Sequence, residues 1–169
     1  MSHSAELIRR LQFAWRITRY DRAYRDSRGA YTIDTWTSVT DVGKVFEGRE
    51  LTLEEYERTE AAYIETFVVF AREANIERVQ VREFPRLEGE PQKDGAVVPI
   101  DEATEILRAM LREEAECRLE APGNDFYVHA GYDLYMYIGA ASSCSQAVVY
   151  AEKLGLFVDP DWPSPYLPD

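Results

Sequence analysis

The sequence predicts an α+β fold, a single domain in which a mainly antiparallel sheet of about five strands carries helices on one face. Short alternating runs predict the strands, and apolar residues at three- and four-residue spacing predict the helices. The order is strand, helix, strand, helix, three strands, helix, and the 169 residues fit one domain. We assign residues 1–158 to this domain. Residues 159–169, which hold four of the eight prolines, are predicted to form an extended or disordered C-terminal tail.

The N-terminal third begins with a strand predicted at Leu11–Tyr20, where apolar and polar residues alternate. The polar stretch Asp21–Asp34 contains Gly29 and is predicted to be a loop. Ser38 or Thr40 is then placed to cap a short helix that ends near Phe46.

The longest helix is predicted at Thr52–Asn75. Thr52 and Glu55 form a capping-box pattern, and apolar residues recur behind them at helical spacing. Glu60 interrupts the apolar seam. It either lies at the edge of that face or is buried beside an arginine, for which the N-terminal segment offers the natural partner.

The second half of the chain continues with a strand, a loop rich in proline and glycine, and a helix capped by Asp101. Three short alternating runs then predict an antiparallel meander, which a last helix and a short edge strand follow. The bounds of these elements are Arg78–Phe84, Pro85–Pro99, Asp101–Glu114, Glu116–Glu120, Asp125–Ala130, Leu134–Gly139, Ser143–Leu154 and Leu156–Val158.

One face of the predicted sheet packs against the helices, and the other combines tyrosine, histidine and arginine. Tyr and Arg are common in binding hot spots, yet they also pair across strands in ordinary sheets. Cross-strand pairing, a protein-binding platform and a platform for a small molecule or RNA all fit this second face. Its residues are Arg118, Glu120, Tyr127, His129, Tyr135 and Tyr137, joined by Arg16, Arg78 and Arg82 if the earlier strands pair in register.

The charge argues for a protein partner. Because the formal net charge is −12, we expect no uniform binding to nucleic acid or to an anionic membrane. Acids concentrate in Thr52–Glu73 and Asp101–Glu116, which are either solvated helix faces or a surface that steers a basic partner. Residues 1–30 are the exception, because seven arginines against three acids give them a net charge of +4.

The sequence shows no catalytic or metal-binding motif, and we expect neither a metal nor a cofactor. Cys144 lies at a predicted helix start, which favours a thiolate, and His129 is the candidate base for it. A packed cysteine and a hydrogen-bonded structural histidine are the simpler interpretation. Cys117 fits a small residue of the core.

Trp36 lies in a segment of capping and anchoring residues that includes Asp34 and Asp41. These residue types predict a defined turn. Trp36 is either an exposed hot spot flanked by acids or a plug that fills the core beneath the turn.

Two stretches carry a resemblance to a known class of protein. The first is Tyr24-Arg25-Asp26 with Gly29 and Tyr31, followed by Asp34-Thr35-Trp36-Thr37-Ser38 and Asp41-Val42-Gly43. The second is Phe126-Tyr127-Val128-His129-Ala130-Gly131-Tyr132-Asp133-Leu134-Tyr135-Met136-Tyr137-Ile138-Gly139. Over most of residues 12–158 the chain resembles small, acidic, single-domain bacterial immunity proteins, which are encoded beside polymorphic or contact-dependent toxins. The resemblance implies a non-catalytic inhibitor that binds a cognate toxin tightly.

We therefore expect a non-catalytic protein that binds and neutralises a basic toxin domain. The predicted contact residues are Asp34, Trp36, Asp41, Tyr127, His129, Tyr132, Asp133, Tyr135 and Tyr137. The alternative is a small-molecule-binding protein or enzyme with a polar aromatic pocket around His129, roofed by Pro85–Pro99. A homodimer through the tyrosine-rich face also fits.

The compartment is predicted from three features of the sequence. No apolar run approaches the ~18 residues of a membrane helix. The polar start Met1-Ser2-His3-Ser4 has no signal-peptide core, and two cysteines do not make a disulfide framework. We expect a cytoplasmic protein.

Overall fold

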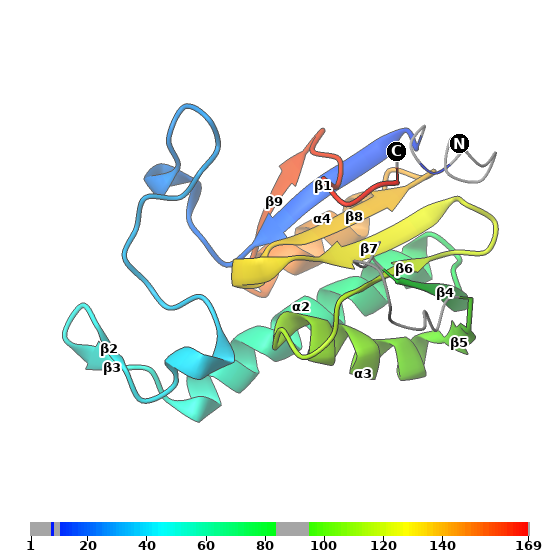
Figure 1. Cartoon of the computed structure of the whole chain (residues 1–169). Coiled ribbons are helices and arrows are strands. Elements are labelled where there is room, and N and C mark those ends of the chain that lie inside the picture. Colours follow the sequence, from blue (N-terminus) through cyan, green and yellow to red (C-terminus); the bar gives the residue numbers. More distant parts are fainter. Residues whose placement is uncertain (1–7, 9–10, 84–94, 169) are drawn as a thin grey trace.

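The fold is α+β, as the sequence predicts, in a computed structural model that describes residues 8, 11–83 and 95–168. Within these residues three α-helices pack against a seven-stranded antiparallel sheet of strand order β5-β4-β6-β7-β8-β1-β9. The sheet has seven strands where about five are predicted, and β5 and β9 form its two edges (Figure 1). β9 corresponds to the short edge strand predicted at Leu156–Val158, whereas β5 lies at the end of the predicted loop Pro85–Pro99, so that part of the loop prediction is wrong. The helices lie on one side of it. Part of the predicted loop Pro85–Pro99, including its place over a pocket, falls outside the described residues.

The strands follow the predicted alternation. In β1 (Phe13–Thr18), Trp15 and Ile17 join the core beneath the helices, whereas Arg16 and Thr18 lie on the opposite face. The predicted meander is confirmed as β6 (Cys117–Glu120), β7 (Phe126–Ala130) and β8 (Met136–Ala140). The remaining strands are β4 (Arg78–Glu83), β5 (Val97–Pro99) and the edge strand β9 (Phe157–Pro160).

The strand register places one continuous row of polar side chains across the face away from the helices. Direct antiparallel pairs link Asp159 to Arg16, Arg16 to Tyr137, Tyr137 to His129, His129 to Arg118 and Arg118 to Arg82. Directly opposed residues project to the same side of an antiparallel sheet. The prediction that Arg16 and Arg82 join the tyrosines and His129 is therefore confirmed.

Helix α2 (Leu53–Glu73) is the longest element and begins as predicted, because the Thr52 side chain accepts a hydrogen bond from the backbone N–H of Glu55. Glu60 is buried within it and pairs with arginines, but not with one from the N-terminal segment. Arg108 donates to its carboxylate over 2.8 Å, and Arg112 donates through two nitrogens over 2.7 and 3.0 Å. Both arginines belong to or directly follow α3 (Ile100–Leu111), so Glu60 ties two helices together.

Two of the helix predictions differ from the structure. The helix expected near Phe46 is a single 3₁₀ turn at Val39–Asp41, followed by a hairpin of β2 (Val45–Phe46) and β3 (Arg49–Glu50). Glu47 and Gly48 turn this hairpin with positive φ angles of 50° and 77°, a conformation that favours a tight turn over a helix. Pro99, which makes no side-chain capping bond, stands at the N-cap position of α3 in place of Asp101. Cys144, with a φ of 42°, is the N-cap residue of α4 (Ser145–Lys153) and so lies at the helix start, as predicted.

The second face of the sheet is not open. The C-terminal segment that follows β9, coloured red in Figure 1, crosses this face on the side opposite the helices. Trp162, Tyr166 and Leu167 pack there against a small cluster formed by Ile8, Tyr127 and Tyr137. Over β1, β6, β7 and β8 the sheet is thus covered on both sides, by helices on one and by an irregular segment on the other.

The arginines of the N-terminal segment hold this second layer in place. The carboxylate of Asp159 forms ion pairs with Arg16, Arg22 and Arg25 over 3.3, 2.8 and 2.8 Å. The guanidinium of Arg16 also lies 3.6 Å from the ring centroid of Trp162. This part of the positive charge of residues 1–30 therefore has an internal structural role.

Candidate functional site

The tyrosine and histidine face that the sequence offers as a platform is buried. The side chains of Tyr127 and His129 are 1% and 0% exposed, and Tyr137 is also buried. Tyr135 is half-buried between Tyr20 and Tyr31. These four predicted contact residues lie together as expected, but the C-terminal segment covers them. Within the part of the chain that the structure describes, His129 therefore lines no open pocket and this face is not open for a dimer.

His129 is the centre of a hydrogen-bonded network beneath the C-terminal segment. Its Nδ1 lies 2.6 Å from the hydroxyl of Ser164, and its Nε2 lies 3.3 Å from the carboxylate of Glu120. The Ser164 backbone N–H donates to the Tyr127 hydroxyl, and Arg118 donates to the backbone carbonyl of Tyr166. Burial lowers the pKa of His129, although the Glu120 carboxylate opposes this shift. These contacts assign His129 to structure.

The two cysteines are buried, and their pKa values favour the protonated thiol over the thiolate. Burial raises the pKa of Cys117 to about 11 and also raises the pKa of Cys144. The Cys144 thiol points into the protein, where the backbone carbonyl of Phe70 and the Ser142 hydroxyl are its neighbours. Both cysteines have the packing role that is the simpler of the two interpretations.

Trp36 is a plug beneath its turn, because it is 4% exposed. Its ring packs edge-on against Tyr56, and the guanidinium of Arg19 lies 3.7 Å from its centroid. Asp41 accepts hydrogen bonds from the backbone N–H groups of Thr37 and Ser38 and so fixes the turn. Of the predicted contact residues in this segment, Asp34 alone is exposed.

Besides Asp34, the predicted contact residues that the structure presents to solvent are Tyr132 and Asp133. Tyr132 is 58% exposed in the short connection between β7 and β8. The next two residues, Asp133 and Leu134, both have φ angles of 60°, in the left-handed region that a bulky residue such as leucine rarely adopts. We call this connection, residues 131–135, the Tyr132 turn.

Two buried tyrosines hold the Tyr132 turn in its strained form. The Tyr20 hydroxyl donates to the carbonyl of Asp133 over 2.6 Å, and the Tyr63 hydroxyl donates to the carbonyl of Leu134 over 2.8 Å. Tyr63 also accepts from the backbone N–H of Arg19 over 2.7 Å, and burial raises its pKa strongly. Strain of this kind persists only where surrounding contacts enforce it, and it concentrates at functional sites.

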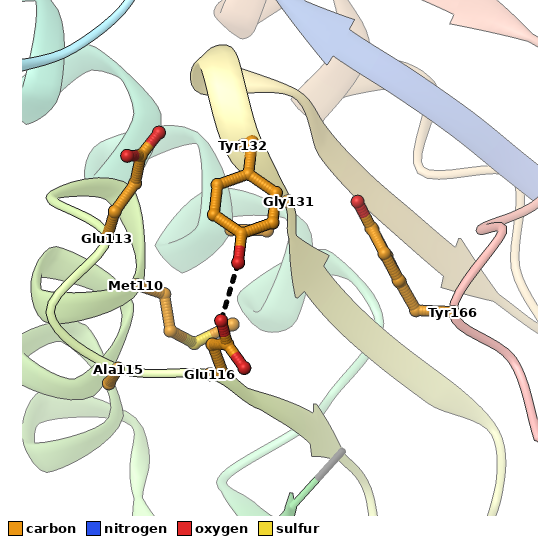
Figure 2. A pocket seen from close by; sticks show the side chains of 8 residues that line it. Met110, Glu113, Ala115, Glu116, Gly131, Tyr132 and Tyr166 are labelled. Atoms are coloured by element: carbon orange, nitrogen blue, oxygen red, sulfur yellow. Dashed lines mark hydrogen bonds between the residues drawn. The ribbon is translucent and has the colours of Figure 1, made fainter. Parts of the chain in front are cut away.

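A hollow of about 140 Å³ lies beside the Tyr132 turn. The C-terminal end of α3, the approach to β6, the turn itself and the C-terminal segment form its walls (Figure 2). The lining residues are Met110, Glu113, Ala115, Glu116, Ala130, Gly131, Tyr132 and Tyr166. The floor is therefore apolar, the sides are aromatic, and two carboxylates stand at the rim.

Hydrogen bonds fix the polar rim of the hollow. The Tyr132 hydroxyl donates to Glu116 over 2.5 Å, which raises the pKa of that tyrosine. The backbone N–H of Asp133 reaches Glu113 over 3.4 Å. The Tyr166 ring lies against the backbone of Gly131, where a Cβ atom would stand 2.2 Å from its hydroxyl oxygen, so any side chain at this position would displace the Tyr166 ring.

The sequence predicted the exposed residues of this site but not its walls. Glu113 and Glu116 were recognisable within the acidic segment Asp101–Glu116, and Met110 as a residue of the apolar helix face. Tyr166 gave no signal, because its contact with Gly131 joins positions 35 residues apart through a segment without regular structure. Asp34 and Asp41 do not line the hollow.

Comparison of the chain with protein-family models, curated proteins and solved structures found no match.

Proposed function

We propose that this protein is a non-catalytic inhibitor that binds a basic protein through the surface around the Tyr132 turn. Because the chain resembles immunity proteins, the proposed partner is a bacterial toxin domain. The carrying observation is the turn itself. It presents an exposed tyrosine and the carboxylate of Asp133 on a strained backbone that two buried tyrosine hydroxyls enforce.

The chemistry of the surface supports a protein as the partner. An exposed, partly fixed tyrosine is a typical hot-spot residue, since it offers a large rigid contact at low entropic cost. The carboxylates of Glu113, Glu116 and Asp133 are exposed around it. Together with the net charge of −12, they favour a positively charged partner and fast association.

The alternative function, ligand binding or catalysis at His129, has no comparable support. A ligand would reach this side chain only after Ser164 and its neighbours left the sheet, because His129 is 0% exposed. The hollow beside Tyr132 is also smaller than the ~300–1,000 Å³ of ordinary small-molecule sites.

The test is capture of a partner by immobilised protein from a lysate of the source cells, at low and at moderate salt. The variant Tyr132→Ala with Glu116→Gln removes the proposed contact. The control Tyr24→Ala with Glu102→Gln changes an exposed aromatic and an exposed acid elsewhere. We expect a stoichiometric basic protein with the wild type and the control, and at least a ~10-fold weaker capture with the first variant.

Equal capture by both variants would place the interface elsewhere, and absence of any stoichiometric partner would overturn the proposal. The inhibitory role is tested by adding the purified protein to the captured partner. Unchanged activity of the partner in the complex would contradict that role.

A further inference from the structure

We infer that the hollow beside the Tyr132 turn receives one arginine side chain of the partner, an inference that rests on the proposed function. The hollow is open to solvent where Tyr132 and two glutamates are exposed, and the buried residues Met110 and Ala130 also line it. Its volume of about 140 Å³ suits a single side chain and not a whole metabolite.

The walls offer the two kinds of contact that a guanidinium group makes, aromatic rings and carboxylates. In Figure 2 the Tyr132 ring stands between Glu113 and Tyr166, with the carboxylate of Glu116 at its hydroxyl. A flat cation stacks on phenol rings and donates to carboxylates from its edge. A carboxylate offers about four acceptor positions, so Glu116 keeps capacity for a second donor after it accepts from Tyr132.

The protein uses the same arrangement for its own arginines. Arg16 lies 3.6 Å from the ring centroid of Trp162 while it pairs with Asp159. Arg19 lies 3.7 Å from the ring centroid of Trp36 and donates to the Trp36 carbonyl over 2.9 Å. In both cases an aromatic face supports the guanidinium and oxygen acceptors orient it, which are the two elements that the hollow offers to a partner.

The charge of the rim selects a cation, and the geometry favours arginine over lysine. A lysine ammonium is strongly hydrated and gains less from a flat aromatic wall. A neutral side chain of the same shape would leave the carboxylates of Glu113 and Glu116 without a charged partner beside them.

Titration of the ¹⁵N-labelled full chain with Nα-acetyl-arginine methylamide, followed by NMR, tests the inference. We expect saturable shifts in the amide signals of residues 113–117 and 130–133. The citrulline analogue, a neutral isostere of arginine, is expected to bind at least ~10-fold more weakly. Glu116→Gln and Tyr132→Ala are each expected to weaken arginine binding at least ~5-fold, whereas the control Glu102→Gln leaves it unchanged.

Equal binding of arginine and citrulline, or shifts confined to other residues, would overturn the inference. Equal binding of the lysine analogue would overturn the assignment to arginine. These failures are distinguishable from failure of the proposed function. If a captured partner depends on Tyr132 but the arginine probe does not bind, the interface stands and the arginine contact falls.

Discussion

At the scale of the residue, buried tyrosine hydroxyls form hydrogen bonds to distant backbone groups that the sequence does not predict. Tyr63 is one of the residues at helical spacing in the helix that the sequence predicts at Thr52–Asn75. The structure adds that its hydroxyl bridges the backbone of Arg19 and of Leu134, which are far apart in the chain. The strained backbone of the Tyr132 turn depends on this contact, since a buried carbonyl requires a donor.

Tyr63→Phe is expected to lower the free energy of unfolding by about 1–3 kcal/mol, because it removes the partner of the buried Leu134 carbonyl and of the half-buried Arg19 N–H. The matched control is Tyr150→Phe, which removes an exposed hydroxyl that donates to Glu65 and should cost under ~0.5 kcal/mol. Urea unfolding followed by circular dichroism measures both. Equal costs for the two variants would show that the Tyr63 bridge does not stabilise the turn.

His129 predicts a pH dependence of stability. Burial lowers its pKa below the ordinary value of 6.5, so the folded protein keeps it neutral at a pH where the unfolded chain takes up a proton. Its contribution is present above about pH 6.5 and is lost as the pH falls, by at most ~1.4 kcal/mol per pH unit. The pKa values of Glu120 and Glu60 are lowered from 4.5, so the stability that these two carboxylates contribute is lost only below about pH 4.5 and does not overlap with the effect of His129.

The measurement is the free energy of unfolding at pH 7.5 and pH 5.5 for the wild type and for His129→Gln, which keeps a hydrogen-bonding side chain without the titration. We expect a smaller difference between the two pH values in the variant. An identical difference in both proteins would show that His129 is not the buried neutral group described here.

At the scale of the element, the alternation of polar and apolar residues predicted the strands correctly, whereas capping residues alone did not predict a helix correctly. The alternation in β1 and the three runs of the meander were sufficient because one face of each strand packs against helices. The helix expected near Phe46 was wrong because Ser38 and Asp41 cap a single 3₁₀ turn, and Gly48 then permits a hairpin. Capping residues mark where a helix begins and do not fix its length.

The C-terminal segment could not be predicted by such patterns, because it has no period and packs on strands and loops that are distant in the sequence. Trp162 packs on Arg16, and a Cβ atom at Gly29 would stand 2.4 Å from the Trp162 ring. Prolines predicted an extended segment there, but composition does not show which surface such a segment covers.

Trp162→Ala tests this layer. We expect a loss of about 2 kcal/mol of unfolding free energy, since a half-buried indole loses its contact with the Arg16 guanidinium and the backbone at Gly29. Tyr24→Ala, which removes an aromatic ring that is 49% exposed, is the control and should change little. If thermal unfolding is the same for both variants, the C-terminal segment contributes no stability.

At the scale of the whole molecule, charge is divided between two roles. Arginines of the N-terminal segment are used internally, on Asp159 and on the rings of Trp36 and Trp162. The acids at the end of α3 and in the Tyr132 turn remain exposed. The excess of acids was visible in the sequence, but only the sheet register and the covering segment show which charges remain available for a partner.

Among the described residues, no helix combines the length and the hydropathy of a membrane-spanning segment.

The role of the exposed charge predicts a dependence on salt. The association rate with a basic partner is expected to fall as ionic strength rises. Salt screens charges that are more than about 10 Å apart at 0.1 M, and this weakens the electrostatic steering of the partner. The dissociation rate is expected to change less, because it depends on the buried contacts at Tyr132. Stopped-flow or biosensor kinetics at several salt concentrations would show an unchanged association rate if the acids have no part in binding.

The most direct test of the central claim is hydrogen exchange of this protein alone and in complex with its captured partner, read by mass spectrometry. The account predicts slowed exchange in residues 113–117 and 131–135, around Glu116 and Tyr132. Slowed exchange confined to α2 and α4, with the Tyr132 turn unchanged, would contradict it and would place the interface on the helical side of the molecule.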